Sequence, residues 1–259
     1  MRMMKKVLGT VTVLALSVSL LAGCGSTAAS PVSSAASTAA ESTTSSVVSE
    51  TTSAAADENV AAAAQLLNDL TGSYQELWPV ILADEYKQTW LDVCTALVGE
   101  DNAEAAFEKL SSMVTGDVYG EDAVEAYANG GGAYFCGFTN SLATLTFDGE
   151  TSTISGTDKD GNVLFSHTYH YIGMEPVRGL YEFESDDADS GEFTYFFLAP
   201  DTSAETYHIE FRYGSDAEAL SQYDAGEYAY WVASGISTDC DQTMIDNCIE
   251  LFCTENLAG

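Results

Sequence analysis

Short runs rich in β-branched and aromatic residues recur from residue 130 onward, and they constrain the fold more than any other feature of this chain. Strong hairpin signals, Asp148-Gly149 and Asp160-Gly161-Asn162, separate several of them. Eight short strands joined by tight turns predict an antiparallel meander that closes, or nearly closes, into a barrel. The runs cover 133–139, 142–148, 151–157, 162–172, 178–184, 193–199, 206–213 and 228–232.

Helical signals flank this β-rich region. An Ala- and Leu-rich run that ends at Leu70 begins with Asp57 and Glu58, as the helix dipole favours. Further helices are predicted over 84–98 and 101–114, with a short one at 216–223 between strands. The predicted fold is therefore mainly β, a barrel with N-terminal helices and a C-terminal helix.

The C-terminal helix is predicted over 239–253. Its apolar residues fall at helical spacing on one face, which we expect to pack on the barrel as a lid rather than to hold a cofactor. These residues are Met244, Ile245, Cys248, Ile249 and Phe252.

The first 24 residues have the layout of a secretory signal peptide. Basic residues precede an apolar run over 7–20, which is too short to span a bilayer comfortably. Leu21-Ala22-Gly23-Cys24 follows and resembles the lipobox of bacterial lipoproteins, in which the cysteine receives a diacylglycerol and becomes the new N-terminus. We predict a signal peptide over 1–23, lipidation of Cys24 and a location on the outer side of the bacterial cell membrane. The alternative is a secreted protein whose mature part begins near Cys24.

Residues 24–56 form the next predicted segment, the lipidated cysteine followed by Ser, Thr and Ala. This composition cannot bury a core, so we expect a disordered spacer between the lipid and the folded part. The remaining residues, 57–259, suit a single domain.

The charge excludes several classes of partner. The chain has 40 acidic and 8 basic residues and a formal net charge of −32, and the segment 1–23 contributes only basic residues to that balance. Nucleic-acid binding requires clustered Lys and Arg, so we expect no nucleic-acid partner. An anionic membrane surface would also repel this chain, which leaves the lipid as the predicted link to the membrane.

Five cysteines follow Cys24, an odd number that cannot pair completely within the chain. None forms a Cys-x-x-Cys motif, so a thiolate zinc site is not indicated, and the disulfide connectivity stays open. Cys94 and Cys248 lie on apolar faces of predicted helices, where a buried thiol is expected. The sequence also lacks the serine-hydrolase elbow, the His-Glu-x-x-His motif and a phosphate-binding glycine loop, so we predict no enzyme.

The strand over 206–213 carries the most interesting side chains. Alternation places Tyr207, Ile209, Phe211 and Tyr213 on one face and His208, Glu210 and Arg212 on the other. An imidazole and a carboxylate two residues apart on a strand lie close enough to share one metal ion, and both suit Zn²⁺. The alternative is a solvated polar face on which Glu210 pairs with Arg212.

Several motifs, in matching order from residue 66 to the C-terminus, resemble those of the ZinT (YodA) family. Residues 67–79 resemble that family's opening pattern Leu-x-Asp-Trp-x-Gly-x-Trp-Gln-x-x-Tyr-Pro. Residues 169–173 and 177–182 resemble its Tyr-x-Tyr-x-Gly and Val-Arg-Tyr-Leu-Phe-Glu. The strand ending at Tyr213-Gly214 is similar to its metal-bearing strand, and residues 228–231 to its last aromatic segment.

The resemblance implies a lipocalin-like (calycin) barrel that binds zinc, and also cadmium, outside the cytoplasm and serves zinc uptake or buffering. It also implies work beside a zinc ABC importer or its solute-binding protein. The family's metal strand carries His-x-His, however, whereas this chain has His208-Ile209-Glu210 and lacks the family's third His and its His-rich loop. Asp201 or Glu205 could fill the gap. His167 and His170 should point to opposite faces of another strand.

Two hypotheses follow. The first is a membrane-anchored protein that binds a divalent metal, with zinc preferred, at His208 and Glu210, where two ligands should bind weakly and the carboxylate favours harder cations. The second is a barrel that has lost its metal site and binds a small organic ligand or an envelope partner through an aromatic-rich cavity.

Overall fold

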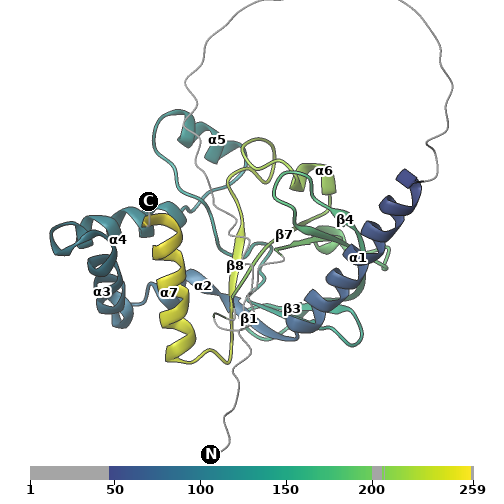
Figure 1. The fold of residues 1–259 in the computed structure, drawn as a ribbon, viewed down its shortest axis with the longest axis horizontal. Coiled ribbons are helices and arrows are strands. Elements are labelled where there is room, and N and C mark those ends of the chain that lie inside the picture. The colour runs from purple at the N-terminus through teal and green to yellow at the C-terminus, as the bar shows by residue number, and fades with distance from the viewer. Residues whose placement is uncertain (1–46, 200–205, 207, 258–259) are drawn as a thin grey trace, which may run out of the picture. The chain divides into compact units, whose positions relative to one another are not determined.

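The structure, a computed structural model, describes residues 47–199, 206 and 208–257, with the backbone alone over 47–57. Its centre is one closed antiparallel barrel in which every strand pairs with its neighbours in the chain and the last strand pairs with the first (Figure 1). The predicted fold class is confirmed. The strands are β1 (Gly72–Glu76), β2 (Thr144–Asp148), β3 (Thr153–Thr157), β4 (Val163–Met174), β5 (Tyr181–Ser185), β6 (Tyr195–Leu198), β7 (His208–Gly214) and β8 (Ala233–Ser237).

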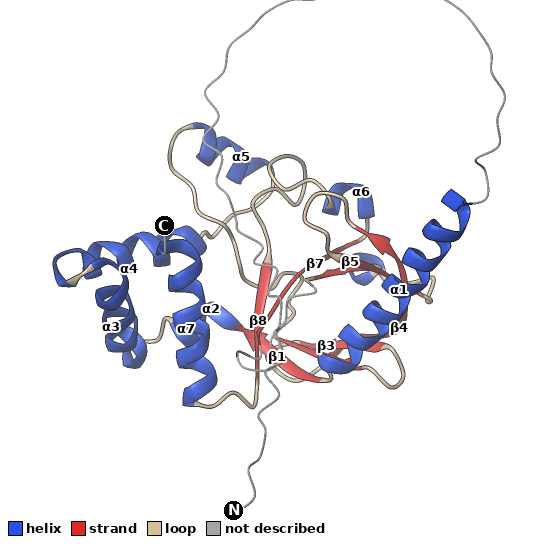
Figure 2. Cartoon of the chain, viewed as in Figure 1, coloured by secondary structure: helices blue, strands red, loops and turns tan. Residues whose placement is uncertain are grey.

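Helices precede, interrupt and follow the strands, and Figure 2 shows them around the barrel. Within the described residues no helix is both long and apolar enough to cross a membrane. Short 3-10 turns lie at Asp84–Tyr86 and Gly191–Phe193. The helices are α1 (Val47–Asp69), α2 (Leu77–Ile81), α3 (Lys87–Val98), α4 (Glu100–Val114), α5 (Glu121–Ala128), α6 (Ala217–Leu220) and α7 (Gln242–Leu257).

Helix α1 begins at Val47, ten residues before the predicted start. Residues 47–56, the end of the spacer expected from the sequence, belong to this helix in the structure. Residues 54–56 are all alanine, the strongest helix former, and extending an existing helix is much easier than starting one. The predicted signal peptide, Cys24 and the rest of the spacer lie outside the described residues.

The sequence placed the first and last strands of the barrel wrongly. The run 133–139 was predicted as a strand, but only Phe135 forms isolated bridges there, and residues 228–232 precede β8 instead of forming it. The first strand is β1, which lies between two helices and was not predicted. Its five residues, three of them polar and one glycine, carry no strong β signal, so their strand conformation depends on pairing with β2 and β8.

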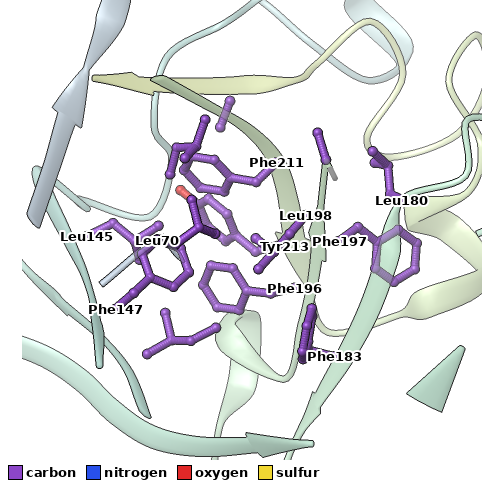
Figure 3. Close-up of a cluster of buried hydrophobic side chains, with 14 of the residues drawn as sticks. Leu70, Leu145, Phe147, Leu180, Phe183, Phe196, Phe197, Leu198, Phe211 and Tyr213 are labelled. Atoms are coloured by element: carbon purple, nitrogen blue, oxygen red, sulfur yellow. The ribbon is translucent and has the colours of Figure 1, made fainter. Parts of the chain in front are cut away.

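The barrel interior is the first hydrophobic core. Along β2, buried Leu145 and Phe147 alternate with more exposed threonines, as expected for a sheet with one face inside. Large side chains from several strands meet at the centre (Figure 3). Helix α1 packs against β2 and β4 and adds Ala63, Leu66 and Leu67 to this core. Leu70, which directly follows the helix, continues the same i, i+3, i+4 and i+7 spacing.

A second core lies outside the barrel, among α2, α3, α4 and α7. The buried stripe of α7, including Ile245 and Ile249, belongs to it, so its predicted packing role is confirmed. The predicted position of α7 as a lid is wrong, because α7 packs mainly against α3. Ile236 of β8 belongs to the same core, so the outer wall of the barrel forms one side of it. Helix α7 is therefore a flank of the barrel wall rather than a lid.

The turn at Gly149 holds α1 against the β2–β3 hairpin. Gly149 does not have a positive φ; Ser152 takes the left-handed conformation instead, so the predicted Asp-Gly turn is built differently. A Cβ at position 149 would lie 2.4 Å from the Cα of Asn68, and the Gly149 amide donates to Thr71 Oγ1 at 3.1 Å. The glycine is needed because helix and hairpin backbones touch.

We expect Gly149→Ala to lower the free energy of unfolding by about 1–3 kcal/mol, because the methyl group would push α1 away from the hairpin. Urea unfolding followed by circular dichroism measures this change. Gly131→Ala is the matched control, since its Cβ would meet nothing within 4 Å. Equal stability of the two variants would contradict the close-approach explanation.

Candidate metal site

The two faces of β7 look into different surroundings. Ile209, Phe211 and Tyr213 are buried in the barrel core, which confirms the predicted alternation for the described residues of this strand. His208 and Glu210 therefore lie on the outer face, toward the layer that contains α2 and α7. Tyr207 lies outside the described residues.

His208 and Glu210 share one small pocket between β7, α2 and α7. Its volume is about 30 Å³, which is enough space for one or two water molecules. A single ion fits such a space. The other lining residues are Leu77, Trp78, Ile81, Cys248, Leu251, Phe252 and Glu255.

Thr206 fixes the imidazole of His208. Its hydroxyl lies 2.6 Å from His208 Nδ1, while its carbonyl oxygen accepts a hydrogen bond from Cys248 Sγ at 3.2 Å. A ligating histidine in metal proteins is usually oriented in this way through its second nitrogen. Because Nδ1 is hydrogen-bonded to Thr206, Nε2 is the nitrogen that could bind a metal ion. The same threonine ties the start of β7 to α7.

Glu255 is the pocket residue that sequence reasoning missed. Cys248, Phe252 and Glu255 are spaced i, i+4 and i+7, so they share one face of α7. That spacing was visible in the sequence, but nothing there indicated that this face meets β7.

The acidic groups around the pocket do not form a finished metal centre. No set of three or more His, Cys, Asp or Glu side chains within 47–199, 206 and 208–257 is arranged to hold a metal ion. His208, Glu210 and Glu255 line one pocket without converging on one point. The sequence candidates Asp201 and Glu205 lie outside the described residues.

The remaining histidines belong to β4. His167 faces inward, where its ring lies near Phe165, and its Nδ1 is 2.8 Å from an Asp187 oxygen. His170 faces outward, 2.7 Å from Asp186. The prediction that they point to opposite faces is confirmed, and neither lines the pocket of His208 and Glu210.

Arg212 is fully buried and does not form the solvated pair with Glu210 that was the alternative prediction. Its guanidinium donates to the carbonyl oxygens of Leu220, Gln222 and Tyr228. Loss of water lowers the pKa of Arg212 to about 10, so the group stays charged at neutral pH. It serves to hold the loop before β8 on the barrel.

The aromatic residues that suggested a ligand cavity form a packed core instead. Phe165 and Phe193 stack with ring centroids 3.9 Å apart, and Phe196 stacks on Tyr213 at 5.3 Å. An eight-stranded barrel is just wide enough for side chains to fill it. A larger hollow of about 330 Å³ lies outside the barrel, lined by Glu76, Trp78, Pro79, Leu82, Val114, Thr115, Gly116, Phe135, Cys136 and Gly137.

Comparison with known proteins gave structural matches only. No family model and no curated protein matches the chain. The chain is similar in structure to a ZinT-like domain. That domain is the Zn(II)-bound ZinT-like domain of Streptococcus pneumoniae AdcA, with 16% identity, coverage of 71% of this chain and 89% of the domain, and a TM-score of 0.45. Zn(II)-bound AdcA from the same organism matches with 15% identity and a TM-score of 0.42, over 72% of this chain and 35% of that protein.

The thiol at the pocket wall gives a pH prediction. Burial, followed by the influence of Cys240, raises the pKa of Cys248 to about 12, against about 8.5 for a free thiol. Between these values the unfolded chain has lost the proton and the folded chain has kept it, so Cys248 makes the free energy of unfolding fall as pH rises. Below about pH 8 the contribution of Cys248 to the free energy of unfolding does not change with pH.

We expect the unfolding free energy of Cys248→Ala to fall less steeply than that of the parent between pH 9 and 11, by about 1.4 kcal/mol per pH unit. Urea titrations under reducing conditions at several pH values measure the slopes. Parallel slopes would show that this thiol ionises in the folded protein as readily as in the unfolded one.

Proposed function

We propose that this protein binds a single divalent metal ion, zinc in the first place, through His208 and Glu210. The observation that carries the proposal is that both side chains line one ion-sized pocket on the outer face of β7. Imidazole nitrogen and carboxylate oxygen are both zinc ligands. Thr206 orients the ring so that Nε2 can serve as the donor. The role is binding, without a catalysed reaction.

We assign Glu255 as the third protein ligand. It lines the same pocket from α7, and its side chain has to turn toward the two β7 donors before all three can share one ion. This movement costs binding energy, so the affinity should be modest. A set of one nitrogen and two carboxylates also reduces the preference for zinc over harder cations such as Mn²⁺.

The proposed setting is the outer side of the bacterial cell membrane, with the folded part tethered through lipidated Cys24. The support is the order of charged, apolar and small residues before that cysteine. The motif resemblance to the ZinT family supports a role in zinc uptake or buffering, near a zinc ABC importer or its solute-binding protein. A lipid tether would keep such a carrier close to a membrane transporter.

The second candidate function is binding of a small organic ligand or an envelope partner. The place proposed for such a ligand is the 330 Å³ hollow beside Trp78, since the barrel interior is packed with side chains. The size of this hollow suits a small molecule, and its lining is mainly apolar.

Zinc titration by calorimetry tests the proposed site, with the full chain carrying Cys24→Ser to avoid lipidation. We expect saturable one-site binding, weakened tenfold or more by His208→Ala and by Glu210→Ala. One tenfold step corresponds to about 1.4 kcal/mol of binding free energy. Glu255→Ala should weaken binding as well if it is the third ligand.

His170→Ala is the matched control, because His170 is a half-exposed histidine on another strand with its own carboxylate partner. It should leave the titration unchanged. Absence of binding at high micromolar zinc, or equal weakening by all the variants, would contradict the proposed site.

Lipidation is tested by labelling cells with radioactive palmitate. The parent chain should incorporate the label and Cys24→Ala should not, because Cys24 is the cysteine that stands in the lipobox-like segment after Leu21-Ala22-Gly23. Cys136→Ala, which removes a buried thiol, should label like the parent. Equal labelling of parent and Cys24→Ala would rule out Cys24 as the lipid site.

A further inference from the structure

Two cysteines from distant parts of the chain meet in the helical core. Cys94 on α3 and Cys253 on α7 are 159 positions apart, yet their sulfur atoms lie 4.0 Å from each other. Both side chains are fully buried. They are free thiols in this structure, and no other two sulfur atoms of the described residues are joined by a hydrogen bond.

The other described cysteines are directed elsewhere. The Cys136 thiol donates to the Tyr134 carbonyl, and Cys248 donates to the Thr206 carbonyl. Cys240 is half-buried just before α7. An odd set of five therefore divides into one close pair and three separate thiols.

We propose that Cys94 and Cys253 form an intrachain disulfide when the protein folds under oxidising conditions. In the cell this rests on the proposed location outside the cytoplasm, where disulfides persist. A disulfide has a sulfur–sulfur distance of about 2.05 Å, so the two atoms must approach by about 2 Å. We assign this approach to rotation of the two side chains, because the helices that carry them already pack together.

The bond forms by thiol–disulfide exchange with a disulfide oxidant, either oxidised glutathione or a protein disulfide. One cysteine thiolate attacks the oxidant, which gives a mixed disulfide and releases one thiol. The second cysteine attacks the mixed disulfide at the protein sulfur, forms the Cys94–Cys253 bond and releases the second thiol. Two electrons pass to the oxidant, and the two protons end on its thiols.

The pairing must occur before the helical core closes. Both thiols are inaccessible in the folded protein, and burial raises the pKa of Cys94 and of Cys253, which removes the reactive thiolate. Once formed inside the core, the bond is shielded from reductants for the same reason.

A Cys94–Cys253 disulfide would also affect the proposed metal pocket. Cys253 directly follows Phe252, which lines that pocket. The bond would fasten α7 to α3 at this point and so hold one wall of the pocket in place. It would also restrict a long segment of the unfolded chain, which stabilises the folded state.

The test uses the full chain carrying Cys24→Ser, unfolded and reduced, then refolded with oxidised and reduced glutathione. Free thiols are alkylated in denaturant, and the digest is analysed by mass spectrometry without reduction. We expect one cross-linked peptide pair that joins Cys94 to Cys253, with alkylated Cys136, Cys240 and Cys248. The oxidised protein should melt on the order of 5–10 °C above the reduced protein.

Two variants separate the disulfide from a general effect of oxidation. Cys94→Ala should show the same melting temperature with and without reductant, whereas Cys136→Ala, another buried thiol, should keep the difference. Five alkylated cysteines, or a cross-link between any other two, would overturn the proposal. Since the assay contains neither membrane nor zinc, its result is independent of the proposed location and metal site.

Discussion

The hydrogen-bonded pairing of β1 with β8 is the constraint on which the rest of the structure depends. It joins residues 74–76 to residues 235–237 and so closes the barrel across almost the whole described chain. Helix α2 follows β1 directly and α7 follows β8 after a short turn, so closure brings both helices to the same outer wall. The pocket of His208 and Glu210 exists because β7, next to β8, forms that wall.

The closed sheet separates two cores that share one wall. On β8, Gly235 faces the barrel interior, where a Cβ would lie 3.1 Å from Ile209, and Ile236 faces the helical core. Interior side chains fill the barrel, which leaves the outer helical layer as the place where polar groups, small pockets and thiols meet. Function is therefore proposed on the outside of the barrel rather than inside it.

Helix α7 connects the two proposals. One face carries Glu255 toward the metal pocket, and Cys253 lies against Cys94 of α3. Its Cys248 holds Thr206, which in turn positions His208. A helix held at several points along its length keeps Glu255 beside the pocket, so that only this side chain has to turn when the proposed ion binds.

The sequence by itself determined the barrel class, six of the eight strands, most helices and the placement of His208 and Glu210 on the strand face opposite Ile209 and Phe211. These follow from local periodicity and turn residues, which are readable within a few positions. Only the tertiary structure decided which strands close the barrel, that α7 flanks its wall, and that Glu255 shares a pocket with β7. It also decided that Cys94 meets Cys253. Each of these depends on contacts between segments far apart in the chain, which no local pattern encodes.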